Sequence, residues 1–243
     1  AEAGDRFGSI LALSGDTALM GAPTDSKVLV LTRTDSDWSR TQEIPRPASL
    51  GETDAFGYRV AIDGDTAVVA GWIRESELGT AHVFVRESGE VTEQAVRRAD
   101  DADSADGFAS ALAIDGDLVV VGAPKDNNSG SAYVFERTET SWAQIDRLTA
   151  YDQAQQHEQF GGAVSVDGDR IVVGAPEDFF RSRFPGTAYV FDRVEGQFEV
   201  TGHLVAMEFG KTRHFDSTLD VSADTVAVGS YCEDDYVGAT YIY

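Results

Sequence analysis

Short apolar runs separated by turn residues recur along the whole chain. The runs are four to seven residues long, are rich in Val, Ile, Leu, Tyr and Phe, and are bounded by Gly, Asp and Pro. Such runs are typical of short β-strands joined by tight turns. No ten-residue helical pattern interrupts them. The pattern therefore predicts an all-β protein.

Five segments of the chain share one pattern, in which a Phe precedes a turn Asp by nine residues. The segments are FGSILALSGD (7–16), FGYRVAIDGD (56–65), FASALAIDGD (108–117), FGGAVSVDGD (160–169) and FDSTLDVSAD (215–224). Each is followed by a second apolar run, a variable polar loop and a third run, and a fourth run closes the first four copies. The Asp-Gly and Ser-Gly dipeptides fit tight hairpin turns. Each copy, about fifty residues long, therefore predicts a four-stranded antiparallel meander.

A lone sheet of this kind would expose apolar side chains on both faces. Along the first strand Leu11, Val60 and Leu112 point one way, whereas Ile10 and Ala111 point the other way. Stacking the sheets radially buries both faces and leaves short edges. We therefore predict one β-propeller domain over residues 1–243, with five blades, a three-stranded last blade and no strand shared between the termini. The expected blades are, approximately, residues 5–50, 51–99, 100–150, 151–206 and 207–243.

The net charge of −23 changes what partners can be expected. Repulsion disfavours nucleic acids and anionic membranes. The chain has 26 Asp and 16 Glu, with 16 Arg and only 3 Lys. Many Asp and few Lys are typical of proteins from salt-saturated surroundings, where screening suppresses self-repulsion. We therefore expect a halophilic source; an ordinary acidic protein is the alternative.

Several classes of protein lack support in the sequence. No run of eighteen apolar residues indicates insertion into a membrane. A single cysteine, Cys232, leaves no internal disulfide, and no Cys/His cluster indicates zinc. We also find no G-x-S-x-G, H-E-x-x-H or P-loop motif. We therefore expect a protein that is not an enzyme.

The recurring Phe-Gly and Gly-Ala-Pro words carry a family resemblance. Phe-Gly occurs at 7–8, 56–57 and 160–161, and Gly-Ala-Pro at 21–23, 122–124 and 174–176. The chain resembles the FG-GAP repeat family, whose best-known members are the N-terminal propellers of integrin α subunits. The resemblance covers the whole chain, although copies three and five depart from Phe-Gly and copies two and five from Gly-Ala-Pro. It implies a ligand-binding face, formed by the loops after Gly-Ala-Pro and the loops leading into Phe-Gly.

Calcium is the cofactor that this resemblance suggests, because integrin-type repeats bind it in a D-x-D-x-D-G loop between the first two strands. The corresponding turns here, such as Asp63-Gly64-Asp65, are too short to supply six to eight oxygens. We expect these turn Asp residues to accept hydrogen bonds from local backbone N–H groups. No cofactor is therefore certain. A Ca²⁺ site is a hypothesis at the acidic loop 100–107, with Asp101, Asp103 and Asp106 as ligands, and a solvated loop is the alternative.

An acidic residue stands two positions before the Phe in four copies. These residues are Asp5, Asp54, Asp106 and Glu158. Recurrence within one chain indicates a role shared by every blade, and hydrogen bonding to loop N–H groups is the simplest such role. We therefore interpret these acids as structural.

The variable loops after Gly-Ala-Pro are the expected place for binding residues, because such loops vary on a common frame. The candidate ligand-binding residues there are Glu75, Glu77, Asp126, Glu177, Asp178, Phe179, Phe180, Arg181, Glu233 and Asp234. The aromatic residues of the fourth loop could form a contact patch or fold over their own blade. Asn127-Asn128-Ser129 matches a glycosylation sequon.

Together these observations favour a non-catalytic binding or adhesion module that is secreted or displayed at a cell surface. Its loop face would bind a protein or a glycan. Two alternatives stay open: a glycan-active enzyme using acidic residues at the channel mouth, and a structural spacer in a larger surface protein. We expect a monomer, unless the chain is a piece of a longer repeat array.

Overall fold

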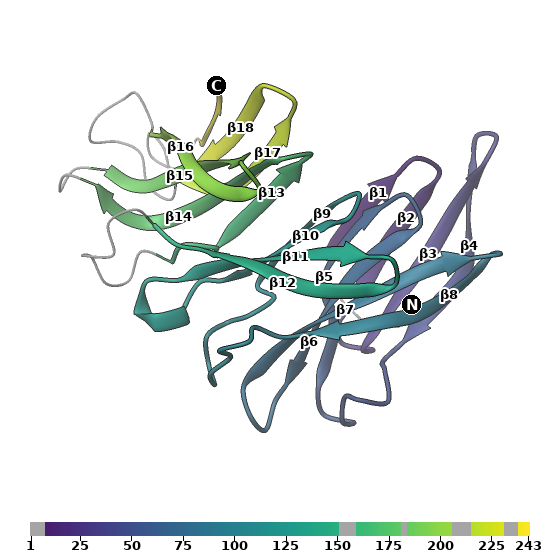
Figure 1. The fold of residues 1–243 in the computed structure, drawn as a ribbon. Helices are drawn as coiled ribbons and strands as arrows, with labels where there is room; N and C mark the ends of the chain where they lie inside the picture. The colour runs from purple at the N-terminus through teal and green to yellow at the C-terminus, as the bar shows by residue number, and fades with distance from the viewer. Residues whose placement is uncertain (1–7, 151–158, 181–183, 206–214, 231–237) are drawn as a thin grey trace.

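A computed structural model describes residues 8–150, 159–180, 184–205, 215–230 and 238–243. It contains nineteen β-strands and one short 3₁₀ turn, η1 (Asp126–Asn128). The strands form five antiparallel sheets, which are the blades of a propeller (Figure 1). No helix in the described part of the chain has the length and apolar character needed to cross a membrane.

Each blade takes its strands from one continuous stretch of sequence. Blade one holds β1 (Ile10–Ser14), β2 (Thr17–Ala22), β3 (Lys27–Thr34) and β4 (Asp37–Pro45); blade two holds β5 (Ala55–Asp63), β6 (Thr66–Ile73), β7 (Leu78–Glu87) and β8 (Glu90–Arg97). Blade three holds β9 (Ala111–Asp115), β10 (Leu118–Ala123), β11 (Ser131–Thr138) and β12 (Ser141–Leu148); blade four holds β13 (Ala163–Asp167), β14 (Arg170–Phe180), β15 (Phe184–Val194) and β16 (Gln197–Leu204). Blade five holds β17 (Phe215–Ser222), β18 (Thr225–Ser230) and β19 (Ala239–Ile242).

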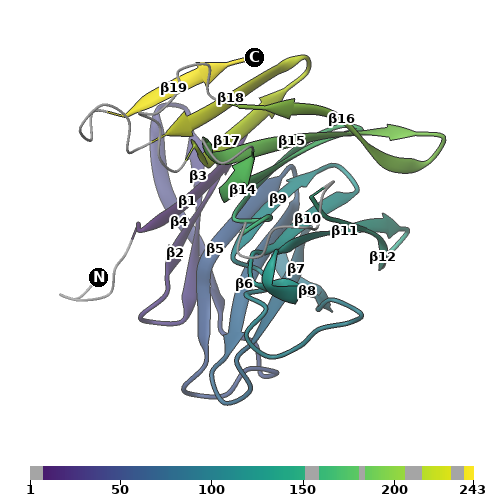
Figure 2. The same cartoon turned by 90° about the vertical axis from the view of Figure 1, so that its left-hand side faces the viewer.

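The strands of every blade pair in chain order, as a meander requires. The last blade is three-stranded, and the described part of β19 pairs with β18 alone. The predicted architecture of five blades is therefore confirmed, with the last one a strand short. Figure 2 shows the sheets following one another around the molecule, from the purple strands near the N-terminus to the yellow strands near the C-terminus.

The hydrophobic core is divided into four clusters, and each lies between two consecutive blades. Blades one and two share a cluster around Leu19 and Phe56, and blades two and three share one around Val68 and Tyr133. The other two clusters join blade three to blade four and blade four to blade five. Among the described residues, no cluster joins blade five back to blade one. The core therefore consists of the junctions between blades.

The repeated Phe is the central side chain of a junction. Phe56 and Phe160 are fully buried, and Phe108 is nearly so. Each ring meets an aromatic residue within the third strand of its own blade: Phe160 lies 5.4 Å from Tyr189 and Phe56 lies 5.6 Å from His82, both in edge-to-face geometry. Such aromatic pairs add stability beyond the area they bury.

The glycines of the repeated words allow consecutive backbones to approach closely. Gly161 has a φ of +89°, and its carbonyl oxygen packs against Gly122 of the preceding blade. A Cβ at Gly122 would overlap that carbonyl, and a Cβ at Gly161 would overlap the Ser131 carbonyl. Glycine avoids both clashes and tolerates the positive φ. The same contact joins Gly21 to the Gly57 carbonyl at the first junction.

The residues of the tight turns bond across the junctions, which corrects part of the prediction for them. In the first four blades, the first residue of the turn accepts a hydrogen bond from the turn N–H of the next blade rather than from its own loop. Ser14 accepts from Gly64 at 3.0 Å, Asp63 from Gly116 at 2.9 Å, Asp115 from Gly168 at 2.7 Å, and Asp167 from Ala223. Turn geometry alone could not reveal this, because the partner belongs to another blade.

The last Asp of the turn has a different role in blades one to three. An Arg at the end of the third strand donates a hydrogen bond from its Nε to this Asp, at 2.7 to 2.8 Å, at Asp16, Asp65 and Asp117. The Arg137 guanidinium also lies over Trp142, 5.2 Å from the ring centroid. These Asp residues are therefore structural, as predicted, but they pair with a cation instead of only with backbone N–H groups.

The acid before the repeated Phe has the predicted structural role where it is described. Asp54 is buried and accepts hydrogen bonds from the backbone N–H of Gly51 at 2.7 Å and of Arg74 at 2.9 Å. Asp106 accepts from the N–H of Asp103 at 2.7 Å. Asp5 and Glu158 lie outside the described residues.

Replacing a junction Phe should destabilise the protein strongly. Phe160→Ala removes a fully buried ring, and we expect a loss of about 3–5 kcal/mol in the free energy of unfolding. Val194→Ala is the control, because Val194 is 40% exposed and its truncation should change the free energy by less than about 0.5 kcal/mol. Urea denaturation measures both. Equal effects would contradict the assignment of the junctions as the core.

His82 should make stability depend on pH. It occupies the slot of Tyr133 and Tyr189, is fully buried, and contacts Glu93 through Nδ1 at 2.6 Å. Burial lowers the pKa of His82, although the hydrogen bond to Glu93 opposes this effect. Below about pH 6.5 the unfolded chain therefore binds a proton that the folded protein resists, so stability falls as the pH falls, by up to about 1.4 kcal/mol per pH unit.

His82→Tyr removes this titration and places in blade two the residue used by other blades. Urea denaturation of both proteins between about pH 8 and pH 5 should show a steeper loss of stability in the natural protein. Parallel curves for the two proteins would contradict a pKa lowered by burial.

Candidate functional site

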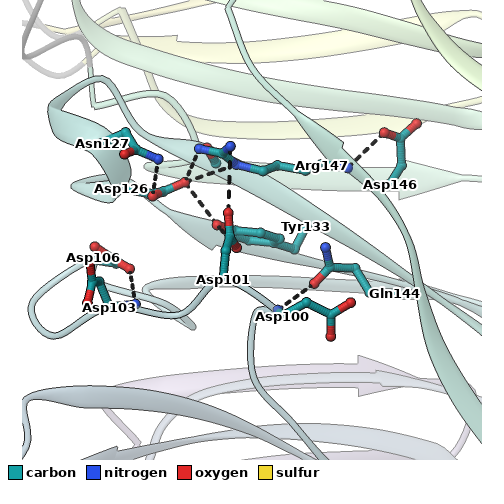
Figure 3. Close-up of polar contacts among 11 residues, drawn as sticks. Asp100, Asp101, Asp103, Asp106, Asp126, Asn127, Tyr133, Gln144, Asp146 and Arg147 are labelled. Atoms are coloured by element: carbon teal, nitrogen blue, oxygen red, sulfur yellow. Dashed lines mark hydrogen bonds and ion pairs between the residues drawn. The ribbon is translucent and has the colours of Figure 1, made fainter.

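Two loops of blade three lie against each other on one edge of the propeller. One is the acidic loop 100–107, which leads into Phe108, and the other is the loop 125–130 after Gly-Ala-Pro. The Lys125 N–H donates to the Asp106 carbonyl at 3.0 Å, which ties the loops together. Residues predicted separately as metal ligands and as ligand-binding residues are thereby brought into one region (Figure 3).

Asp126 is the buried centre of this region. It begins the 3₁₀ turn η1, in which Asn127 adopts a left-handed backbone with a φ of +49°, a conformation that Asn tolerates better than most residues. The carboxylate of Asp126 accepts hydrogen bonds from Arg147 Nη2 at 2.7 Å and from the Asn127 side chain at 2.9 Å. Its carbonyl accepts from the Gly130 N–H at 2.8 Å. Asp126 therefore fixes both the shape of its loop and the position of Arg147.

Arg147 and Tyr133 face each other across strands β12 and β11. They are directly paired in the register, and the guanidinium lies 5.9 Å from the centroid of the Tyr133 ring. Arg147 Nε also donates to the Ser131 hydroxyl at 3.1 Å. Burial would lower the pKa of Arg147, but the hydrogen bond and charge of Asp126 outweigh it and raise the pKa. Arg147 is therefore a fixed positive charge on a rigid pair of strands.

The Tyr133 hydroxyl lies between two carboxylates. It is 2.9 Å from an oxygen of Asp126 and 2.9 Å from an oxygen of Asp101. A phenol has one proton and can donate to one carboxylate at a time. Burial, followed by these hydrogen bonds, raises the pKa of Tyr133, which therefore stays neutral. The group formed by Asp101, Asp126, Tyr133 and Arg147 contains two carboxylates but one guanidinium. Its carboxylate oxygens can therefore accept a hydrogen bond from a further donor.

The three predicted metal ligands do not converge. Asp101 turns toward Tyr133 and lies 3.6 Å from Arg147 Nη1, whereas Asp106 holds the backbone N–H of Asp103 (Figure 3). Burial raises the pKa of Asp106, the Asp103 N–H opposes it, and the charges of Asp126, Asp103 and Asp101 add to the rise. In the described ranges no three His, Cys, Asp or Glu side chains are grouped to hold a metal ion.

A pocket of about 290 Å³ opens beside the Asp126–Arg147 pair. It is lined by Asp126, Asn127, Ser129, Gly130, Arg147, Thr149 and Ala150. Its wall therefore offers a carboxylate, an amide, hydroxyl groups and a guanidinium, all attached to strand ends or to a loop that is hydrogen-bonded internally. We refer to it below as the blade-three pocket.

The other predicted binding residues are not part of this pocket. Glu75 and Glu77 are exposed in the loop of blade two, and the Glu77 carbonyl accepts from the Ala105 N–H at 3.2 Å. The backbone of Glu177, Asp178, Phe179 and Phe180 forms the end of β14. Arg181, Glu233 and Asp234 lie outside the described residues. Of the ten, the structure places Asp126 in the pocket.

Sequence reasoning missed Tyr133 and Arg147 as members of the site. Tyr133 occupies a third-strand position that is His82 and Tyr189 in the neighbouring blades, so nothing in the sequence sets it apart. Arg147 carried a usable signal, because the residues at the same cross-strand position in other blades are Glu43, Val96 and His203. A blade-specific cation opposite a repeated aromatic residue distinguishes this blade.

Removing Asp126 should cost more stability than removing its counterpart in blade one. Asp126→Ala leaves Arg147 without its main partner, and we expect a loss of about 1–3 kcal/mol in the free energy of unfolding. Asp25→Ala is the control, because Asp25 holds the same place in its loop but forms an exposed pair with Lys27 at 3.1 Å, which is worth less than about 1 kcal/mol. Thermal or urea denaturation compares them. Equal losses would contradict a buried anchoring role for Asp126.

Comparison with known proteins identifies the repeats. A family model described as FG-GAP repeat matches residues 1–36, 48–84, 91–135 and 142–191, which is more than half of the chain. Integrin alpha-11 of Homo sapiens is 29% identical over 146 residues, and that of Mus musculus is 30% identical over the same length. Each alignment covers 53% of this chain, and the chain spans 12% of the length of these relatives.

A search of solved structures finds a GH43 endo-arabinanase from Bacillus licheniformis, with a TM-score of 0.46 and 13% identity, covering 96% of this chain and 91% of the other. That likeness is too weak to carry an argument about function. The four repeat matches, by contrast, coincide with the Phe-Gly and Gly-Ala-Pro contacts that join the blades. This chain belongs to the FG-GAP repeat family.

Proposed function

We propose that this protein is a non-catalytic binding module that recognises its ligand in the blade-three pocket. The observation that carries the proposal is the Asp126–Arg147–Tyr133 arrangement, in which a fixed cation and a buried carboxylate border an open pocket. The proposal places the module on a secreted or cell-surface protein. Membership of the FG-GAP family and similarity to integrin alpha-11 support that location.

The cationic side chain of the pocket is held in place before a ligand binds. Asp126 holds the Arg147 guanidinium through Nε at 3.1 Å and Nη2 at 2.7 Å, so this side chain needs little ordering when a ligand binds. A preorganised group lowers the entropic cost of association. The side chains of a spacer would have no need of such an arrangement, which argues against that alternative.

The chemistry of the pocket favours a glycan among the two predicted ligand classes. Hydroxyl groups of a sugar both donate and accept, and the pocket wall contains an acceptor in Asp126 and donors in Arg147 and Asn127. The net charge of −23 disfavours a strongly anionic ligand. A neutral, hydroxyl-rich saccharide therefore fits better than an acidic one.

A glycan array in high salt, followed by titration of a bound saccharide, tests this function. We expect Arg147→Leu to weaken binding at least tenfold, because the charged donor is lost; tenfold corresponds to about 1.4 kcal/mol. Thr149→Ala tests the same pocket without touching the Asp126–Arg147 pair. Glu43→Ala is the matched control at the equivalent position of blade one and should leave binding unchanged.

The same saccharides are then incubated with the protein and assayed for hydrolase and lyase products. Binding without turnover supports a binding module. Turnover would support the glycan-active enzyme instead. Binding that is unchanged in both pocket variants would show that the binding site lies elsewhere on the loop face.

A further inference from the structure

The first blade exposes the face that every later blade buries. Along β1, Ile10 and Ala12 pack toward blade two, so Leu11 and Leu13 point the other way, and each is 59% exposed. Trp38 on β4 is 41% exposed, whereas Trp142 and Phe198, at the same position in blades three and four, are 3% and 8% exposed. Blade one therefore presents an apolar face of the kind that elsewhere receives a preceding blade.

The last blade exposes the opposite kind of face. Val226 and Val228 of β18 pack toward blade four, which leaves Thr225 and Ile242 on the other side. Ile242 is 66% exposed, whereas Val190 at the same position in blade four is 8% exposed. Blade five thus presents the face that elsewhere receives a following blade.

Two polar contacts recur at the internal junctions. The first residue of a turn accepts a hydrogen bond from the middle N–H of the next turn, as Ser14 does from Gly64. At the first two junctions, the residue after the turn also accepts from the third-strand Arg of the next blade: Thr17 from Arg86 Nη1 at 2.9 Å and Thr66 from Arg137 Nη1 at 3.0 Å. These contacts align one blade on the next.

The two end faces carry the matching halves of both contacts. The last turn reads Ser222-Ala223-Asp224-Thr225, which repeats the Ser…Asp-Thr of Ser14-Gly15-Asp16-Thr17. Thr225 is exposed, whereas Thr17 and Thr66 are 5% and 4% exposed beneath their Arg partners. On blade one, Arg33 donates to Asp16 through Nε at 2.8 Å and Nη2 at 2.6 Å.

Arg33 is therefore held by Asp16 as Arg86 is by Asp65 and Arg137 by Asp117. The Nη1 of Arg33 corresponds to the atom through which Arg86 and Arg137 donate a hydrogen bond to a Thr of the preceding blade. The blade-five face thus supplies Ser222 and Thr225 as acceptors, and the blade-one face supplies the Gly15 N–H and Arg33 as donors. The apolar parts, Ile242 on one side and Leu11, Leu13 and Trp38 on the other, complete the match.

We propose that two copies of this chain associate head to tail, with the blade-five face of one copy docked on the blade-one face of the other. The contact would repeat the internal junctions, with Ser222 accepting from Gly15 and Thr225 from Arg33. Closure within one copy would require the four existing junctions to shift together; turn hydrogen bonds hold all four, and glycine packing holds the first three. Docking a second copy leaves them unchanged.

Such an interface is heterologous, so it leaves one free face at each end of a pair and can continue. Each copy carries a net charge of −23, so the pair repels at low ionic strength. Salt screens this repulsion without weakening apolar burial. Association is therefore expected to strengthen as salt is raised.

The test measures mass by light scattering and sedimentation across protein concentration in high salt. The natural chain should exceed its monomer mass of 26.1 kDa. Leu13→Asp damages the blade-one face and Ile242→Asp damages the blade-five face; each alone should weaken association at least tenfold. Both positions are exposed, and thermal melting checks that the variants fold. Val194→Asp, at a 40% exposed residue on an outer turn, adds the same charge and should associate like the natural chain.

Mixing the two variants decides the polarity of the contact. Leu13→Asp keeps an intact blade-five face and Ile242→Asp an intact blade-one face, so the mixture should form one-to-one pairs that grow no further. Ser222→Asp, which introduces the residue found in the turns of blades two to four, should tighten association of the natural chain. A monomer at every concentration and salt would overturn the proposal, as would self-association of either variant that equals that of the mixture.

Discussion

The close approach of one blade's backbone to the next is the constraint on which the rest of the structure depends. A carbonyl of Gly161 packed on Gly122 leaves no room for a Cβ at either contact, so glycine is required at both positions of this junction. When the backbones are this close, the Phe that precedes the glycine packs between the two sheets. The turns at the other end of the strands are then near enough to bond from blade to blade.

This constraint also explains why the candidate site lies where the blades differ. A position used at every junction cannot change without losing a contact that each blade needs. The cross-strand position of Arg147 lies outside the junction contacts, and blades one, two and four fill it with Glu43, Val96 and His203. Blade three could therefore acquire a cation there while Tyr133 kept its packing against Phe108. The site combines a structural Tyr, an Asp whose place in the loop is also Asp in blade one, and an Arg found in blade three alone among these four blades.

The fold could be predicted from the sequence because the same strand and turn signals occur five times, so that errors in one copy are corrected by the others. The role of Asp54 could be predicted for the same reason, and its hydrogen bonds to loop N–H groups stay within its own blade. The cross-blade partner of Asp63 could not, because it depends on the register between sheets. The pairing of Asp101 with Tyr133 could not either, since it depends on the path of an irregular loop.

The pairing of Arg with the turn Asp bears on how the composition should be interpreted. Arg33, Arg137 and Arg193 each lie over an aromatic ring while facing a carboxylate. A planar guanidinium can stack on a ring and donate sideways at the same time, whereas the point charge of a Lys ammonium cannot do both. Part of the excess of Arg over Lys therefore has a cause within the fold. The prediction of a halophilic source then rests on the excess of Asp and on the net charge, and less on the scarcity of Lys.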